Sequence, residues 1–425
     1  MTNLNRRSFL GATAVGTVAM TADMTALNVL QSKALADELK ANQKRVILLW
    51  LAGGASQLET FDPKPGRPTG GPFRAIPTAE PGIQICELMP KLAARIKHTA
   101  IVRSLDTNNG DHGSGARLMH LGRRDEPTIK YPDLGAMVAR ELGRADSQVP
   151  DYVSFYTATE GRGNAYSQSG FLGARYNSMF LTEQNVPPNL RRLEEINEID
   201  HQDRAALRDL LSARFARGRE SSSSLASHNE AYSRVRGLMA SEKLFDISGE
   251  SQQVRDLYGP TLFGEQALIA RRLVEAGVPF VKVSRAWWDS HGQNFETHLE
   301  LVTELDNVMA ALIDDLSSRG LLEHTLIVTL SEFGRTPQIN ASLGRDHFGT
   351  AWSMSLTGCG VKGGTVYGAT DEDGHQVKDG KVGAAQVFAT IFQALGIDHQ
   401  KDYHVGSRPL PLTDPGTQPI REVLA

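Results

Sequence analysis

Continuous apolar runs are the feature that most constrains what this chain can fold into. Residues Arg45–Leu51 are apolar after the first position and end at a Gly53-Gly54 pair. A strand with one face in water alternates polar and apolar residues, whereas a strand of a parallel sheet is buried on both faces. The run therefore predicts a fully buried strand. The same kind of run recurs at Thr99–Leu105, Val278–Ser284, Thr325–Leu330 and Trp352–Thr357.

Helical patterns lie between several of these runs. They cover Leu134–Leu142, Gly264–Ala276, Phe295–Leu316 and Ala384–Leu395. Strands that alternate with helices are typical of an α/β fold with a doubly wound, mostly parallel sheet flanked by helices. At roughly 150 residues per domain the length would also allow two or three domains, but one large domain over residues 41–425 fits as well.

The segment 177–260 differs from the rest of the chain. It is polar, it has no strand-like run, and its charged helical stretches are Leu190–Arg217 and Leu225–Lys243. We expect this segment to be a helical insertion at one edge of the sheet.

The first 36 residues carry the pattern of an export signal. Arg6-Arg7 precede a mildly apolar stretch, Phe9–Met20, and Ala34-Leu35-Ala36 has the small-x-small form of a cleavage site. The stretch is shorter than the roughly 20 apolar residues of a membrane span. We predict a twin-arginine signal peptide over residues 1–36, with the twin-arginine export machinery as a partner. The product would be periplasmic or secreted and not membrane-spanning; the alternative is a chance arginine pair on a tail.

Charge and cysteine content exclude several classes of protein. The chain has 45 Lys and Arg against 49 Asp and Glu, a formal charge of −4, so a nucleic-acid binder built on bulk positive charge is excluded. The two cysteines, Cys86 and Cys359, exclude a disulfide-dense scaffold and a four-thiolate zinc site. Whether these two cysteines pair with each other stays open at this point.

Loops that contain acidic residues or histidines follow the runs that end at Leu51, Leu105, Ser284 and Leu330. A further loop of this kind precedes the run that begins at Trp352. Ligands of doubly wound sheets bind beyond the carboxyl ends of the strands, so these loops define the candidate site. Asp289 and His291 are two residues apart, so in an extended loop both side chains leave on one side and can share a metal ion. The alternative is a turn with an Asp cap and a surface histidine.

Other candidates come from neighbouring loops. Glu332 follows a buried strand and could be a carboxylate ligand or could form a salt bridge with Arg335. Asp346 and His347 are adjacent, so their side chains diverge and we expect one of them to point into a site. Ser114 lies between two glycines before an expected helix at Ala116–Leu121, where it could be an N-cap or a nucleophile.

The sequence contains a match to the glycine motif of dinucleotide-binding folds, but the residues around the match do not have the expected structure. Gly358–Gly363 matches GxGxxG, but the residues that follow it, Gly364–Tyr367, are strand-like or turn-like rather than helical. We therefore expect no dinucleotide site. The sequence also has no P-loop, HExxH or GxSxG pattern.

The ordered motifs of the chain resemble one family. They occupy residues 51–65, 111–122, 288–292, 332–337, 344–348 and 360–371, and together they resemble the twin-arginine-exported bacterial family known as domain of unknown function 1501. That family resembles the alkaline phosphatase and sulfatase superfamily, which implies a metal-assisted hydrolase at the carboxyl edge of the sheet.

The resemblance also implies roles for individual residues. Asp289, His291, Glu332 and His347 would be the metal ligands, whereas Gly53-Gly54 stand where the superfamily has an aspartate. Aligning Gly122-Arg123 on the end of the sulfatase nucleophile motif places His112 at the nucleophile position, with Ser114 two residues later. The catalytic candidates are therefore Ser114, His112 and Arg335.

The function expected on this basis is hydrolysis of a phosphate or sulfate ester of a small molecule or glycan. The cofactor would be a divalent ion, namely zinc, calcium, magnesium or manganese, with Arg335 or Arg345 neutralising the oxyanion. The alternatives are a catalytically degraded binding protein of the same fold and a serine hydrolase that uses Ser114, a histidine and Asp289.

Overall fold

The computed structural model describes residues 43–425 except 145–146, 148, 156–157, 160–161, 164–167, 182–184, 187–194 and 220–241. The predicted signal peptide and most of the stretch Leu225–Lys243 lie outside the described residues. Residues Lys44–Ala425 form one compact unit.

An eight-stranded sheet is the centre of this unit. Its order is β14 (Thr365–Tyr367), β4 (Thr99–Leu105), β13 (Trp352–Gly358), β10 (Thr325–Leu330), β1 (Arg45–Leu51), β9 (Phe280–Arg285), β5 (Tyr152–Phe155) and β8 (Met179–Leu181). Only β13 runs antiparallel to its neighbours, so the prediction of a mostly parallel sheet is confirmed. Each of the predicted apolar runs forms one of these strands.

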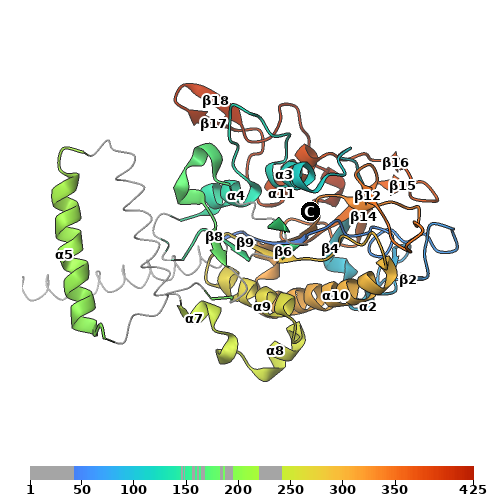
Figure 1. Cartoon of the computed structure of the whole chain (residues 1–425), viewed down its shortest axis with the longest axis horizontal. Helices are drawn as coiled ribbons and strands as arrows, with labels where there is room; N and C mark the ends of the chain where they lie inside the picture. Colours follow the sequence, from blue (N-terminus) through green and yellow to red (C-terminus); the bar gives the residue numbers. More distant parts are fainter. Residues whose placement is uncertain are drawn as a thin grey trace, which may run out of the picture. The chain divides into compact units, whose positions relative to one another are not determined.

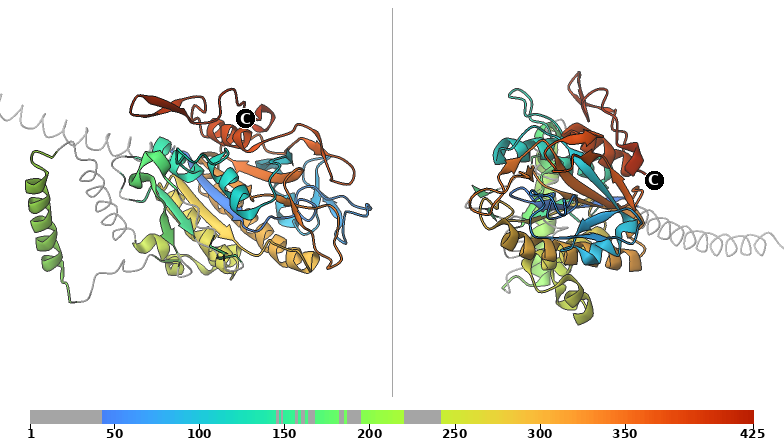
Figure 2. Two further views of the ribbon diagram at one scale, coloured as in Figure 1. Left: turned by 45° about the horizontal axis from the view of Figure 1, so that its top comes forward. Right: turned by 90° about the vertical axis from the view of Figure 1, so that its right-hand side faces the viewer.

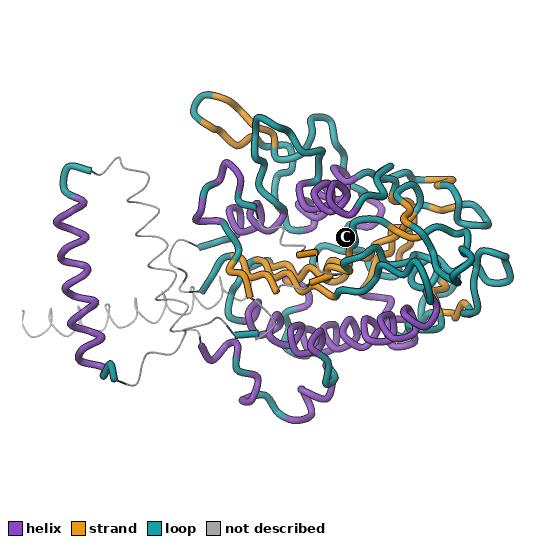
Figure 3. Tube along the Cα trace, viewed as in Figure 1, coloured by secondary structure: helices purple, strands orange, loops and turns teal. Residues whose placement is uncertain are grey.

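Helices cover both faces of the sheet, which explains why the strands show no alternation. Ile47 and Leu49 of β1 face one layer and Val46, Leu48 and Trp50 face the other. The first layer holds α2 (Pro90–Ala93), α9 (Leu262–Glu275) and α10 (Asn294–Ser318). The second holds α3 (His112–Leu121), α4 (Leu134–Leu142) and α11 (Ala384–Ala394), so the sheet lies between two helical layers (Figure 1; Figure 3). Figure 2 shows the same layers from two other directions.

The expectation that the segment 177–260 contains no strand is wrong. Strand β8 lies in it and pairs with β5 in parallel, from Val153 opposite Met179 to Phe155 opposite Leu181. Three residues at the sheet edge are too few to produce a recognisable apolar run. The described part of this segment also holds α5 (Glu198–Ala216), α7 (Glu242–Phe245) and α8 (Gln252–Tyr258).

In the eight-stranded sheet, the antiparallel direction of β13 decides which loops meet. The carboxyl ends of β1, β4, β9 and β10 lie at one edge of the sheet, because these strands are parallel. Strand β13 runs the other way, so its amino end, and not its carboxyl end, lies at that edge. The loop before Trp352 therefore joins the loops that follow the other strands.

Both cysteines are buried and free, so the open alternative of a disulfide is not realised. Burial raises the pKa of the Cys86 thiol to about 12 and also raises that of Cys359, which keeps both thiols protonated. Among the residues that the structure describes, no helix combines the length and the apolar character needed to cross a membrane.

Candidate metal centre

Two glycines let the loop after β1 approach the centre of the site. Gly53 and Gly54 have φ values of +120° and +93°, a backbone region that favours glycine. A Cβ on Gly53 would lie 2.5 Å from the backbone nitrogen of Asp289, and one on Gly54 would lie 2.5 Å from the ring of Phe333. The Gly53 N–H donates to Glu332 Oε1 at 2.8 Å.

Helix α3 begins at His112 and presents this residue to the site. Asp111 is the N-cap, and its carboxylate accepts a hydrogen bond from the Ser114 N–H at 2.8 Å. The ring of His112 lies between two carboxylates, with Nδ1 2.9 Å from Glu332 Oε1 and Nε2 3.0 Å from Asp289 Oδ2. The helix therefore starts four residues before the predicted Ala116.

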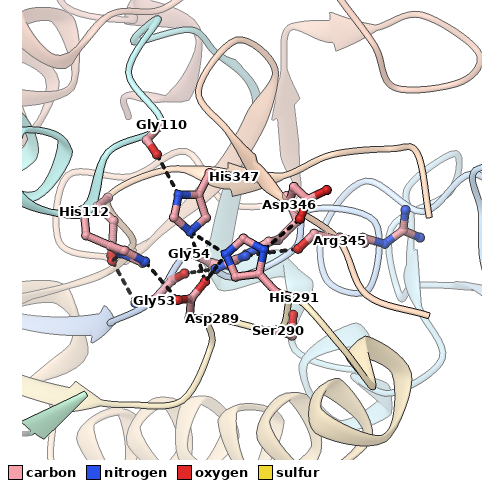
Figure 4. Close-up of polar contacts among 12 residues, drawn as sticks. Gly53, Gly54, Gly110, His112, Asp289, Ser290, His291, Arg345, Asp346 and His347 are labelled. Atoms are coloured by element: carbon pink, nitrogen blue, oxygen red, sulfur yellow. Dashed lines mark hydrogen bonds and ion pairs between the residues drawn. The ribbon is translucent and has the colours of Figure 1, made fainter. Parts of the chain in front are cut away.

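Two further histidines approach Asp289 from the loops after β9 and before β13. His291 Nδ1 lies 2.7 Å from Asp346 Oδ1, and His347 Nδ1 lies 2.7 Å from the carbonyl oxygen of Gly110. Their Nε2 atoms lie 3.2 Å and 3.0 Å from Asp289 Oδ1, and 3.0 Å from each other. Figure 4 shows the three imidazole rings grouped around the Asp289 carboxylate.

The hydrogen bonds at Nδ1 fix where the protons of these histidines lie. A carbonyl or carboxylate oxygen only accepts, so in neutral His291 and His347 the proton is on Nδ1 and the Nε2 lone pair faces inward, whereas His112 has a carboxylate at each ring nitrogen. The lone pairs of His291 and His347 then face the Asp289 carboxylate, which has no proton to offer. Such an arrangement is unfavourable unless a positive charge lies among them, and a metal ion held by imidazoles with oxygen acceptors at their other nitrogens meets that need.

The residues present therefore fit a divalent ion. Ligand atoms of His112, Asp289 and His347 all lie within 4.8 Å of one another. The Asp289 side chain is only 7% exposed, and Glu332 is fully buried, so the negative charge is concentrated in a region of low dielectric.

The pKa values reflect this excess of negative charge. Burial lowers the pKa of His112, but the hydrogen bonds to Asp289 and Glu332 outweigh burial and raise it to about 9. Burial raises the pKa of Asp289, but His112, His347 and Arg335 together hold it far below the ordinary value. The site thus stabilises cationic partners of its carboxylates.

Comparison with protein families places the chain in one of them. Residues 43–424 match the family model described as "Protein of unknown function (DUF1501)". The chain belongs to the DUF1501 family. No curated protein matches this DUF1501 chain in sequence.

Solved structures with a similar fold include a sulfatase, a phosphonate monoester hydrolase and a member of the alkaline phosphatase superfamily. The PsFucS1 sulfatase from Pseudoalteromonas sp. is 14% identical with a TM-score of 0.41, covering 88% of this chain and 72% of that chain. A phosphonate monoester hydrolase of Agrobacterium radiobacter is 12% identical with a TM-score of 0.35, covering 84% and 74%. A protein in the alkaline phosphatase superfamily from Vibrio parahaemolyticus is 11% identical with a TM-score of 0.35, covering 84% and 67%.

Three of the four predicted metal ligands, Asp289, His291 and His347, lie together in the structure. The fourth, Glu332, does not contact the two histidines of this group directly. Asp289, His291 and His347 contact one another, whereas Glu332 reaches the group through His112. His112 was expected at the nucleophile position, and the structure places it in the inner position expected for Glu332. Asp346 and His347 diverge as expected, since Asp346 binds the outer nitrogen of His291.

The prediction that Ser114 is an N-cap is wrong, because Asp111 is the N-cap of α3. The Ser114 hydroxyl lies 3.0 Å from Asp111 Oδ1 and 3.1 Å from Asn109 Oδ1. Side chains two apart on a helix point in different directions, so with His112 facing Asp289, Ser114 faces elsewhere. Its role as nucleophile stays a prediction.

Neither arginine expected to contact an oxyanion is accessible. Arg335 and Arg345 are both fully buried. Arg345 donates to Glu59 and to the carbonyl oxygens of Thr336, Pro337 and Thr69, and Figure 4 shows its guanidinium directed away from the histidines. Arg335 donates to Asp289 and to backbone oxygens. Their burial in the core, which local sequence does not reveal, removes both from contact with a substrate.

Proposed function

We propose that this chain is an exported, metal-dependent hydrolase of phosphate or sulfate esters. The observation that carries the proposal is the convergence of three histidine Nε2 atoms on the Asp289 carboxylate, each ring with an oxygen at its Nδ1. The resemblance of the DUF1501 family to the alkaline phosphatase and sulfatase superfamily supports the choice of ester.

The donor set favours zinc among the four ions considered. His112, His291, His347 and Asp289 would hold the ion, and imidazole nitrogens suit zinc, whereas magnesium and calcium prefer sites made of oxygen alone. When bound, such an ion would polarise the ester and lower the pKa of a water molecule.

The exposure of the ligands indicates from which side a substrate approaches. The side chain of His291 is 49% exposed and that of His347 is 24% exposed, whereas Asp289 is 7% exposed. An ester therefore approaches from the His291 side. Asp346 orients His291, and Glu332 orients His112 on the inner side, so both rings are fixed before a substrate binds.

The test is hydrolysis of 4-nitrophenyl phosphate and 4-nitrophenyl sulfate by the mature protein, stripped with a chelator and reloaded with each of the four ions. We expect turnover of at least one ester in the zinc-loaded protein. Asp289→Asn should lose it, and the matched surface change Asp373→Asn should keep it, since Asp373 pairs with Arg67 at the surface. Zinc binding with no turnover of either ester would instead support a degraded binding protein.

Ser114→Ala in the same assay separates the serine hydrolase from the metal-dependent one. The Ser114 hydroxyl bonds to Asp111 and Asn109, so we expect the variant to keep its turnover and to lose about 1 kcal/mol of stability or less. Abolished turnover with intact metal content would favour the serine mechanism.

A further inference from the structure

Arg335 fills a cage of oxygen atoms behind the candidate metal centre. Its guanidinium donates to Asp289 Oδ1 at 2.5 Å, to the Gly54 carbonyl at 2.8 Å, to the Arg345 carbonyl at 3.1 Å and to the Gly53 carbonyl. These oxygens come from loops that lie far apart in the sequence. None of the guanidinium is accessible to solvent.

The cage has the composition of a cation site. Backbone carbonyl and carboxylate oxygens are the ligands that hard cations prefer. In a buried place these oxygens would lack partners without a positive charge among them. The glycine pair makes the cage possible, since a Cβ on Gly54 would also come within 3.3 Å of Arg335 Nε.

Arg335 and the histidines share one oxygen of Asp289. Oδ1 receives the guanidinium from the inner side, while His291 Nε2 and His347 Nε2 lie 3.2 Å and 3.0 Å away on the exposed side. The carboxylate is thus held in place by a fixed cation on one side and open to an exchangeable cation on the other.

We propose that Arg335 is a positioning residue that serves as a built-in cation, so that the centre takes one exchangeable divalent ion. The inference rests on the proposed function because that function supplies the ion. It assigns Arg335 to the orientation of Asp289 and removes it from contact with the substrate.

The test is metal stoichiometry and affinity. Mature protein is stripped with a chelator and titrated with Zn²⁺ and with Mn²⁺, with calorimetry and native mass spectrometry as readouts. We expect one ion per wild-type chain. Arg335→Ala opens the oxygen cage and should bind two ions, the second with a preference for Mn²⁺. Arg335→Lys keeps the charge and should bind one ion at least tenfold more weakly, because a single ammonium cannot span the same oxygens.

Arg271→Ala is the matched control. Arg271 is also a buried arginine, 1% exposed, but it pairs with Glu250, Glu275 and Asp315. This control should lose stability and still bind one ion with unchanged affinity, so a general effect of removing a buried arginine is separated from the effect on the centre.

The outcomes separate this inference from the proposed function. Two ions in the wild-type chain, or one ion at unchanged affinity in Arg335→Ala, would overturn the role of Arg335 alone. A wild-type chain that binds no ion would overturn the proposed function and this inference with it. If Arg335→Ala does not fold, the wild-type stoichiometry and the metal affinity of Arg335→Lys test the role of Arg335 instead. Two ions in wild type, or an unchanged affinity in Arg335→Lys, would overturn that role.

Discussion

Each histidine of the candidate centre depends on an oxygen partner for its orientation. Glu332 and Asp346 hold His112 and His291, and the carbonyl of Gly110 holds His347. Partners of this kind fix the tautomer and raise the basicity of the nitrogen that faces the metal. The functional set is therefore larger than the atoms that would contact an ion.

Glu332→Gln tests this dependence. The amide keeps an oxygen near His112 Nδ1 and the Gly53 N–H but removes the charge, so we expect metal affinity to fall by roughly 10- to 100-fold. Competition with a chromogenic chelator measures the affinity. Glu304→Gln is the control, since Glu304 lies on α10 outside the cluster and pairs with Arg285 of β9. Equal affinities for wild type and Glu332→Gln would mean that Glu332 is structural only.

The residue types at the site were predictable, but their depth in the site was not. Acid and histidine in loops after buried runs indicated Asp289, His291, Glu332 and His347. Whether Glu332 faces an ion or lies behind a histidine depends on where α3 begins. Asp111 is the N-cap of this helix, and Asp is a preferred N-cap residue, so the sequence does contain a signal that α3 begins at His112. A helix that begins there predicts His112 as a residue of the centre.

At the scale of elements, the site depends on how closely loops pack at the sheet edge. Strands β1, β4, β9 and β10 were predictable because long apolar runs are strong signals. Strands β8 and β14, of three residues each, were too short to be identified as runs. The antiparallel direction of β13 was not predictable, because a buried strand looks the same in either direction.

Gly53→Ala tests the close approach of the β1 loop. The new Cβ would lie 2.5 Å from the Asp289 nitrogen, so Asp289 must shift; we expect weaker metal binding and a loss of about 1–3 kcal/mol of stability. Gly66→Ala is the control because Gly66 also has a positive φ, +75°, but no atom of the described residues lies within 4 Å of its Cβ position. Similar losses of metal affinity in both variants would contradict a specific role for the contact.

A buried lysine on β9 predicts a pH dependence of stability. Lys282 is 2% exposed, lies 3.4 Å from His120 Nε2, and burial lowers its pKa from 10.5 to about 8. Between these two values the unfolded chain binds more protons than the folded one, so the free energy of unfolding rises with pH in that window.

Lys282→Met should remove this rise. Urea unfolding at pH 8 and pH 10 should show a smaller increase in the variant than in wild type. Lys381→Met is the control, because the Lys381 side chain is 68% exposed. An identical slope in wild type and Lys282→Met would show that Lys282 does not titrate differently in the folded state.

At the scale of the whole molecule, we propose that the centre is completed before or during export, since twin-arginine export carries folded proteins. Changing Arg6 and Arg7 both to Lys should leave folded, uncleaved precursor in the cytoplasm. Cell fractionation with an antibody to the mature chain measures this. Normal processing and periplasmic recovery of the variant would exclude the twin-arginine route.

The most direct measurement of the central claim is anomalous diffraction from crystals of the mature protein loaded with zinc, collected on both sides of the zinc absorption edge. We predict one anomalous peak at roughly 2.0–2.2 Å from the Nε2 atoms of His112, His291 and His347 and from an oxygen of Asp289. The absence of a peak among these atoms, in protein that is fully folded and saturated with zinc, would contradict the account.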